Sequence, residues 1–152
     1  MIKQIKLSHI LMLFIATVTF IVTSQVTTHA SVRADATERT ARRQLGKPYR
    51  YGATGTKAFD CSSFTQYVFK KHHVHLPRTA QQQFNATKHV RGIHARKGDL
   101  VYFGKNRKSI DHVGMYLGDG MMIDSQLRGV VVEAVHAPWW HVVGYSRPAK
   151  WA

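Results

Sequence analysis

The only cysteine of this chain, Cys61, stands where a polar, glycine-containing loop gives way to a segment with helical periodicity. A thiolate, and not a thiol, attacks carbonyl carbon, and the free N–H groups and dipole at a helix start favour the thiolate. Most free cysteines are small buried apolar side chains. The position of Cys61 at a predicted helix start instead indicates a nucleophile.

A histidine on a predicted strand supplies a candidate base. Residues 112–117 alternate between apolar and other side chains, so the apolar ones face the core and His112 projects from the opposite face. In the following segment the alternation makes Met121 and Ile123 the expected core positions. A three-residue loop between the two segments pairs Met115 with Ile123 and Leu117 with Met121.

The same register places Asp124 opposite Gly114 and diagonal to His112. A two-residue turn over residues 119–120 would slip the register by one and turn Asp124 away, but it would also oppose the two apolar sets. The alternation therefore predicts that His112 and Asp124 are neighbours on one face of a hairpin.

These residue types match a nucleophile, a base and a group that orients the base. A carboxylate at Asp124 would fix the tautomer of His112 and leave the other ring nitrogen facing Cys61. Gln126 lies on the same face and is an alternative orienting group. A lone histidine on a strand is usually exposed or simply hydrogen-bonded, so the assignment depends on the combination.

The N-terminal segment has the pattern of an export signal. Lys3 and Lys6 precede an apolar run over residues 7–22, and Ala30 fits a small-residue cleavage site. The run is shorter than the ~20 residues that a spanning helix needs. We therefore expect residues 1–30 to be a secretory signal peptide and residues 31–152 to be one mature domain, with no stable membrane insertion after cleavage; an uncleaved anchor is the less favoured alternative.

Charge and cysteine content agree with export. Lys3 and Lys6 leave with the signal, which lowers the 22 basic residues to 20 against 8 acidic ones and the formal charge from +14 to +12. A secreted protein with one thiol keeps it for pairing or chemistry. Such a charge suits a polyanion, and an exported protein meets anionic wall polymers rather than nucleic acid. Simple solubility is an equally weighted alternative, because the basic residues are scattered.

The predicted elements place helices before strands. Helices are expected over residues 33–45, ended by Gly46, over 61–71, capped by Asp60, and over 79–84. Strands are expected over residues 100–103, 112–117, 121–125, 130–134 and 142–145. Helices followed by a meander of strands describe an α+β domain.

Five motifs, in order, resemble the NlpC/P60 cysteine peptidases of bacterial cell walls, over nearly the whole mature chain. They are GKPYRYG at 46–52, FDCSSF at 59–64, LPRTAQ at 76–81, KGDLVYF at 97–103 and HVGMYLG at 112–118. The resemblance implies a papain-like fold, with helices packed on an antiparallel sheet. It also implies hydrolysis of peptidoglycan stem peptides, commonly between D-γ-glutamyl and a diamino acid, by a secreted, wall-associated enzyme.

The resemblance assigns roles to individual positions. Cys61 matches the family nucleophile, His112 the base, and Tyr51 the tyrosine that lines the site near the cysteine. Asp60 and Ser62 match positions that help to bind the free amino end of the stem peptide in relatives. Asp60 also has a simpler role as a helix cap.

Two positions depart from the family pattern: Ala53 follows Gly52 where relatives often have a second glycine, and the main departure is at the third polar residue of the site. The third polar residue of the family is most often histidine, and Asp124 stands there instead. A carboxylate orients imidazole and stabilises its cation, so the change is chemically tolerable.

No metal or cofactor is required by this chemistry. His72, His73 and His75 cluster, but they fall at a helix end without the spacing of a zinc site, so we interpret them as solvated. Trp139 and Trp140 adjoin the last strand, and core packing is favoured over stacking on sugar rings.

Three other functions remain open. A related CHAP-type amidase would cut the amide that joins glycan to stem peptide, although the motifs at 46–52 and 59–64 favour the endopeptidase. A transacylase would use the same acyl-enzyme with a different acceptor. A non-enzymatic cationic wall-binding protein would need the charge alone.

Overall fold

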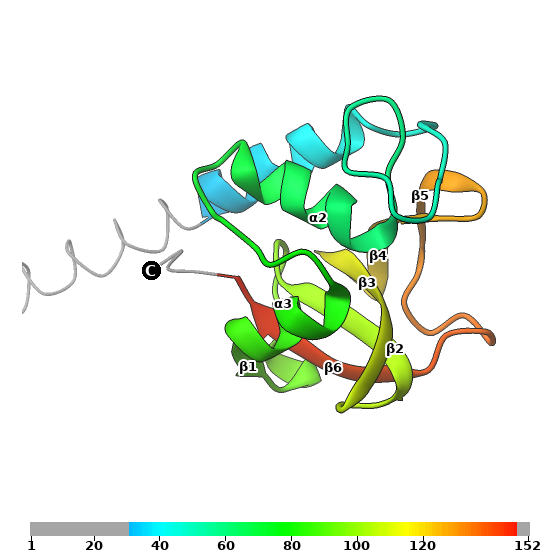
Figure 1. Ribbon diagram of the computed structural model, residues 1–152. Helices are drawn as coiled ribbons and strands as arrows, with labels where there is room; N and C mark the ends of the chain where they lie inside the picture. Colours follow the sequence, from blue (N-terminus) through cyan, green and yellow to red (C-terminus); the bar gives the residue numbers. More distant parts are fainter. Residues whose placement is uncertain (1–30, 149–152) are drawn as a thin grey trace, which may run out of the picture. The chain divides into compact units, whose positions relative to one another are not determined.

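The computed structural model describes residues 31–148, which form helices followed by an antiparallel sheet (Figure 1). The chain is helical over residues 31–42. The remaining elements are α2 (Cys61–Lys70), α3 (Ala80–Ala86), β1 (Lys88–Val90), the short 3-10 helix η1 (Gly92–His94), β2 (Leu100–Asn106), β3 (Ser109–Gly118), β4 (Met121–Gln126), β5 (Gly129–Ala134) and β6 (Val142–Arg147). The predicted α+β class is confirmed. The predicted signal peptide lies outside the described residues.

The sheet has six strands in the order β1-β6-β2-β3-β4-β5, and every pairing is antiparallel. Strands β2 to β5 form the predicted meander, and β6 returns to pair with β2. Strand β1, a three-residue edge strand that pairs with β6, was not predicted from the sequence. Lys88–Val90 is too short to display an alternation, so only the pairing with β6 reveals it.

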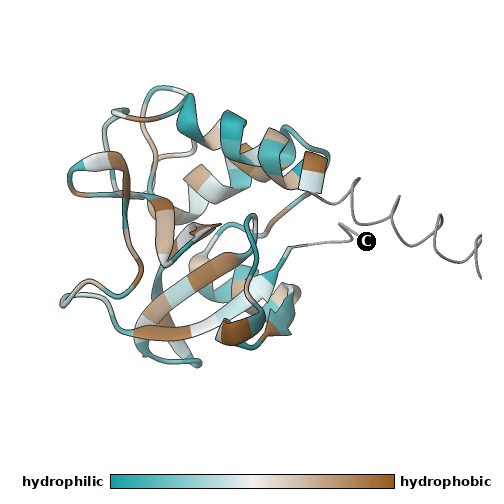
Figure 2. Ribbon diagram, turned by 180° about the vertical axis from the view of Figure 1, so that it is seen from behind, coloured by the Kyte–Doolittle hydropathy of each residue, from teal (hydrophilic) through white to brown (hydrophobic). Residues whose placement is uncertain are grey.

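Both faces of the sheet are covered. Tyr102 meets the ring of Phe84 from α3, with ring centroids 5.0 Å apart. Val101 and Phe103 alternate with Tyr102 along β2 and therefore point to the opposite face. On that face they form a second small core with Met122 and Val135. Figure 2 shows hydrophobic positions along the strands when the sheet is seen from behind.

This second core corrects one prediction for β4. Ile123 is fully buried as expected, but Met121 is only half-buried, and Met122 is fully buried on the other face. An alternating pattern predicts that one face of a strand is buried and that the other face is exposed. Here the segment after β5 covers the other face, so both kinds of position are buried.

The β3–β4 hairpin confirms half of the predicted register. Met115 pairs with Ile123 as expected, whereas Met121 pairs with Gly118 and not with Leu117. An irregularity between Tyr116 and Gly118 absorbs the difference before the turn, where Asp119 has φ 51°. Such a bulge adds one residue to one strand, so the register shifts by one on the turn side while the pairing of Met115 with Ile123 is kept.

Candidate active site

Cys61 is the first residue of α2, and its position is fixed by the cap before it. The Asp60 carboxylate accepts the Ser63 N–H at 2.7 Å, and Ser63 Oγ accepts the Asp60 N–H at 3.0 Å. The predicted N-cap is thus confirmed as a reciprocal capping box. As the first helical residue, Cys61 has a backbone N–H with no partner inside the helix.

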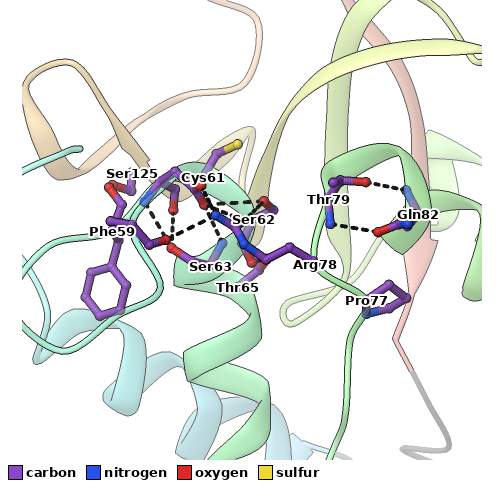
Figure 3. Close-up of polar contacts among 12 residues, drawn as sticks. Phe59, Cys61, Ser62, Ser63, Thr65, Pro77, Arg78, Thr79, Gln82 and Ser125 are labelled. Atoms are coloured by element: carbon purple, nitrogen blue, oxygen red, sulfur yellow. Dashed lines mark hydrogen bonds and ion pairs between the residues drawn. The ribbon is translucent and has the colours of Figure 1, made fainter. Parts of the chain in front are cut away.

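Arg78 holds the polar side chains that flank Cys61. Its guanidinium forms an ion pair with Asp60 and donates to Ser62 Oγ at 2.9 Å and to the Ala53 carbonyl at 3.2 Å. In Figure 3, Arg78 reaches toward the start of α2, and the sulfur of Cys61 points away from these polar contacts. Burial raises the pKa of Asp60, but the Arg78 and Ser63 hydrogen bonds outweigh it and leave this pKa below its ordinary value.

His112 and Asp124 are in direct contact. His112 Nε2 lies 2.6 Å from Asp124 Oδ2. The Asp124 residue is fully buried, and the His112 side chain is 12% exposed. A Cβ on Gly114, which lies between them on the same face, would stand 3.2 Å from Asp124 Cβ and 2.8 Å from Met122 Sδ. The absence of a side chain at Gly114 therefore permits this close approach.

The other ring nitrogen of His112 is left for the thiol. Burial lowers the pKa of His112, but hydrogen bonds with Asp124 and then with Cys61 raise it to about 9. Cys61 Sγ also lies 3.9 Å from the carbonyl oxygen of Asp111, a contact that the sequence did not indicate. At neutral pH these contacts favour the imidazolium form of His112, which lies beside the Cys61 sulfur.

The other candidate orienting group is engaged elsewhere. Gln126 Oε1 accepts the backbone N–H of Arg128 at 2.9 Å, within the turn that follows β4. Of the two candidates, Asp124 is therefore the one that contacts His112.

Tyr51 lies at the solvent edge of the site. Tyr51 belongs to a loop that is fixed by isolated β-bridges from Tyr49 and Thr54 to Phe59, and it is 88% exposed. Arg78 has a raised pKa, chiefly because of its hydrogen bond with Asp60, and the charges of Cys61 and Tyr51 add to the effect. Tyr51 is thus near enough to influence the same cation as Cys61, and it is free to meet a ligand.

Trp139 and Trp140, which precede β6, have different environments. Trp139 is 67% exposed, whereas Trp140 packs against the second core and stacks on the His112 ring. The favoured prediction of core packing is thus right for Trp140. No pattern in the sequence pointed to its contact with His112, because the two residues are 28 positions apart and on different segments.

Within residues 31–148 no three His, Cys, Asp or Glu side chains are grouped as metal ligands would be. In the same range, no helix has the length and hydropathy needed to cross a bilayer.

Comparison with known proteins now adds to this geometry. The profile of the NlpC/P60 family matches residues 46–145. This chain belongs to the NlpC/P60 family. Its sequence is 42% identical over 109 residues to the probable endopeptidase p60 of Listeria welshimeri, which covers 70% of this chain and 21% of that protein. It is 40% identical over 107 residues to the bifunctional muramidase/DL-endopeptidase CwlT of Bacillus subtilis, covering 67% of this chain and 32% of that protein.

Structural comparison leads to the same family. The crystal structure of an NlpC/P60 family protein from Bacillus cereus matches with a TM-score of 0.73 and 35% identity, over 76% of this chain and 40% of that one. The predicted NlpC/P60 fold, with helices on an antiparallel sheet, is therefore confirmed. This chain spans only about a fifth to a third of the curated relatives named above.

Proposed function

We propose that this NlpC/P60 protein is a cysteine endopeptidase that hydrolyses peptidoglycan stem peptides. One observation carries the proposal: His112 contacts the Asp124 carboxylate at 2.6 Å through one nitrogen, and its hydrogen bond with Cys61 helps to raise its pKa. A buried carboxylate that contacts an imidazole, which in turn contacts a thiol, is the arrangement that acyl transfer needs.

The first chemical step is attack on the scissile carbonyl. The Cys61 thiolate adds to the carbonyl carbon while the imidazolium of His112 stays beside it. The developing oxyanion lies toward the free backbone N–H at the start of α2, where the helix dipole stabilises negative charge. His112 then gives its proton to the leaving amine, the C–N bond breaks, and a thioester remains on Cys61.

The second step returns the enzyme to its initial state. Neutral His112 takes a proton from a water molecule, which attacks the thioester and releases the acyl group as a carboxylate. Asp124 holds the ring in one orientation through both proton transfers and stabilises its cation. A different amine in place of water would give the transacylase reaction from the same thioester.

We propose the bond between D-γ-glutamyl and the diamino acid as the cleavage point. Support comes from CwlT, which is named a DL-endopeptidase. A relative in Bacillus cereus named gamma-D-glutamyl-L-lysine dipeptidyl-peptidase is also similar to this chain, with 39% identity over 94 residues. Both names specify the configuration or the residues on either side of such a bond.

Tyr51, Asp60 and Ser62 are the proposed substrate-binding residues. Tyr51 is exposed beside the site and offers an aromatic face and a hydroxyl. Asp60 and Ser62 adjoin Cys61, but both already contact the Arg78 guanidinium. A stem-peptide amine would therefore have to compete with Arg78 for the Asp60 carboxylate.

We further propose secretion by residues 1–30 and association with the wall. A group of basic side chains near the end of α2 supports the proposal that the protein binds an anionic polymer of the wall. The pKa of His72 is lowered, first by burial and then by the charges of His73, Arg43 and Arg39. Exposed Lys70 ends α2, and exposed Lys71, its C-cap, directly precedes His72 in the chain. Anionic polymers would be attracted to such a surface, and the attraction would weaken with salt.

Mass spectrometry of digestion products tests the proposed reaction. Purified peptidoglycan and muropeptides are incubated with the mature protein and, in parallel, with Cys61→Ala, which removes a half-buried thiol and should leave the fold intact. Fragments split between D-glutamyl and the diamino acid, absent with Cys61→Ala, support the proposal. Free glycan with intact stem peptides would identify an amidase instead. Products joined to a second amine would identify a transacylase, and binding without cleavage would identify a wall-binding protein.

A further inference from the structure

The indole of Trp140 lies flat against the imidazole of His112. The two ring centroids are 4.4 Å apart, and the ring planes differ by 16°. Phe103 completes the group, at 4.7 Å from Trp140 and 5.7 Å from His112. The proposed base therefore has Asp124 at one edge and a large aromatic plate across one face.

Trp140 is held from several sides. It packs against the second core of Val101, Phe103, Met122 and Val135, and its backbone N–H donates to the Ala137 carbonyl at 2.8 Å. These contacts come from β2, from β4 and from the segment that follows β5. The orientation of the indole is thus fixed by the sheet and does not depend on His112 alone.

A buried acid lies beside the indole N–H. Trp140 Nε1 and Glu133 Oε1 are both buried, and neither reaches hydrogen-bond geometry with a described group. Burial and the charge of Asp124 raise the pKa of Glu133, whereas the Trp140 N–H and Arg128 lower it. The indole N–H therefore lies near the Glu133 carboxyl group without a hydrogen bond to it, while Glu133 Oε2 accepts from Arg128 at 2.6 Å.

A parallel aromatic face has two physical effects on an imidazole. It attracts the protonated ring, because the negative face of the indole interacts with a cation. It also excludes water from one side of the His112–Asp124 contact, which strengthens that contact by lowering the local dielectric. Leucine of comparable burial would provide the second effect and not the first.

We propose that Trp140 is a positioning residue for the reaction: its indole fixes the plane of His112 and stabilises the imidazolium that pairs with the Cys61 thiolate. This inference rests on the proposed function. The charged or titratable groups that face His112 are Cys61 from α2, Asp124 from β4 and Glu133 from β5. Trp140 adds a neutral fourth side that also favours the cation.

The formation of the thiolate provides a readout that does not require substrate. Cys61 is the only cysteine, so the rate of its alkylation by iodoacetamide reports one thiol. The rate is measured against pH for the wild type, Trp140→Phe and Trp140→Leu in the full chain. Both variants lose the indole N–H, but only Trp140→Phe keeps an aromatic face.

We expect Trp140→Leu to raise the thiol pKa by about half a unit to one and a half units, since this is the range that cation–π contacts span between exposed and desolvated sites. Its kcat on muropeptides should fall about tenfold with little change in KM, and Trp140→Phe should recover most of both losses. Trp139→Phe, a change at an exposed neighbour, is the matched control and should leave both readouts as in the wild type. A folded Trp140→Leu protein with the alkylation profile of the wild type would overturn the proposal.

A second measurement avoids the risk that Trp140→Leu fails to fold. Fluorinated tryptophan weakens the negative potential of the ring face with little change in size. The wild type grown with it should show a raised thiol pKa, whereas Trp140→Phe grown in the same way should not differ from its unlabelled form. An equal response in both proteins, or none in either, would contradict the role of the Trp140 face. Because this readout needs no turnover, it stays informative if the proposed reaction is wrong.

Discussion

Asp124 Oδ2 lies 2.6 Å from His112 Nε2, and Asp124 Oδ1, also fully buried, has no hydrogen-bond partner among the described residues. A buried carboxylate with one oxygen unpartnered is costly to keep ionised unless a cation is beside it. The contact therefore favours protonated His112. Fold stability alone does not explain an acid at this place, but the proposed proton transfers do.

Asp124→Asn should lower kcat on muropeptides by about a hundredfold or more, the typical scale of acid–base catalysis. The amide can still contact the ring, but it no longer stabilises the cation. The free energy of unfolding should change much less than the rate, because a costly buried charge is lost together with its favourable contact. Steady-state kinetics and urea unfolding measure the two effects. Asp119→Asn, an exposed turn residue, is the matched control, and a near-normal rate for Asp124→Asn would reject the assigned role.

The raised pKa of His112 predicts how stability depends on pH. A group whose folded pKa of about 9 exceeds its ordinary value of 6.5 contributes stability fully below pH 6.5 and loses it as pH rises through 9. The unfolding free energy should therefore decline between pH 6.5 and 9, and activity should decline at the upper end as the imidazolium loses its proton. Urea unfolding followed at several pH values measures this. Other groups also titrate in alkali, so His112→Gln is the comparison. Its unfolding free energy should decline less between pH 6.5 and 9 than that of the wild type, and equal declines in the two proteins would contradict the prediction.

Arg78→Met should destabilise the fold by about 1–3 kcal/mol, because it leaves the buried Asp60 carboxylate at the start of α2 without a counter-ion. The Arg78 side chain is 36% exposed, so solvent screens part of its interaction with Asp60 and keeps the loss within this range. Asp60→Asn in the same background should recover part of the loss, since asparagine is also a good N-cap. Arg42→Met breaks an exposed pair with Glu38 and should cost less than about 0.5 kcal/mol. Chemical denaturation compares the variants, and equal losses at Arg78 and Arg42 would contradict the structural role of Arg78.

Gly114→Ala should impair activity by moving Asp124. The new Cβ would stand 2.8 Å from Met122 Sδ and 3.2 Å from Asp124 Cβ, so the side chains of Met122 and Asp124 have to move. Overpacking of this kind costs about 1–3 kcal/mol. Gly118→Ala has open space but a φ of 95°, and it should lower stability through backbone strain while sparing kcat. Rates and melting temperatures measured together separate the two effects; a Gly114→Ala enzyme as active as Gly118→Ala would refute this account of Gly114.

Sequence periodicity predicted the elements that position the site. The helix with Asp60 as its cap, and the hairpin that brings His112 toward Asp124, both depend on local patterns that extend over several residues. The pairing of Met115 with Ile123 followed from matching two apolar sets. The bulge before the turn did not, because a glycine-rich turn accepts several backbone solutions with the same alternation.

Contacts between distant segments were not predictable in the same way. Arg78 is part of a recognised motif, yet nothing local indicates that it binds Asp60. Trp140 reaches His112 only because β6 folds back beside β2 and the preceding segment covers the second face. Such contacts depend on tertiary packing, to which periodicity and propensity are insensitive.

The most direct test of the central claim is the intact mass of the protein, quenched in acid during turnover of a muropeptide. Our account predicts a transient adduct equal to the D-glutamyl fragment, located by digestion to the peptide that contains Cys61 and absent from Cys61→Ala. Cleavage that proceeds with no adduct on Cys61, and equally well in Cys61→Ala, would contradict it.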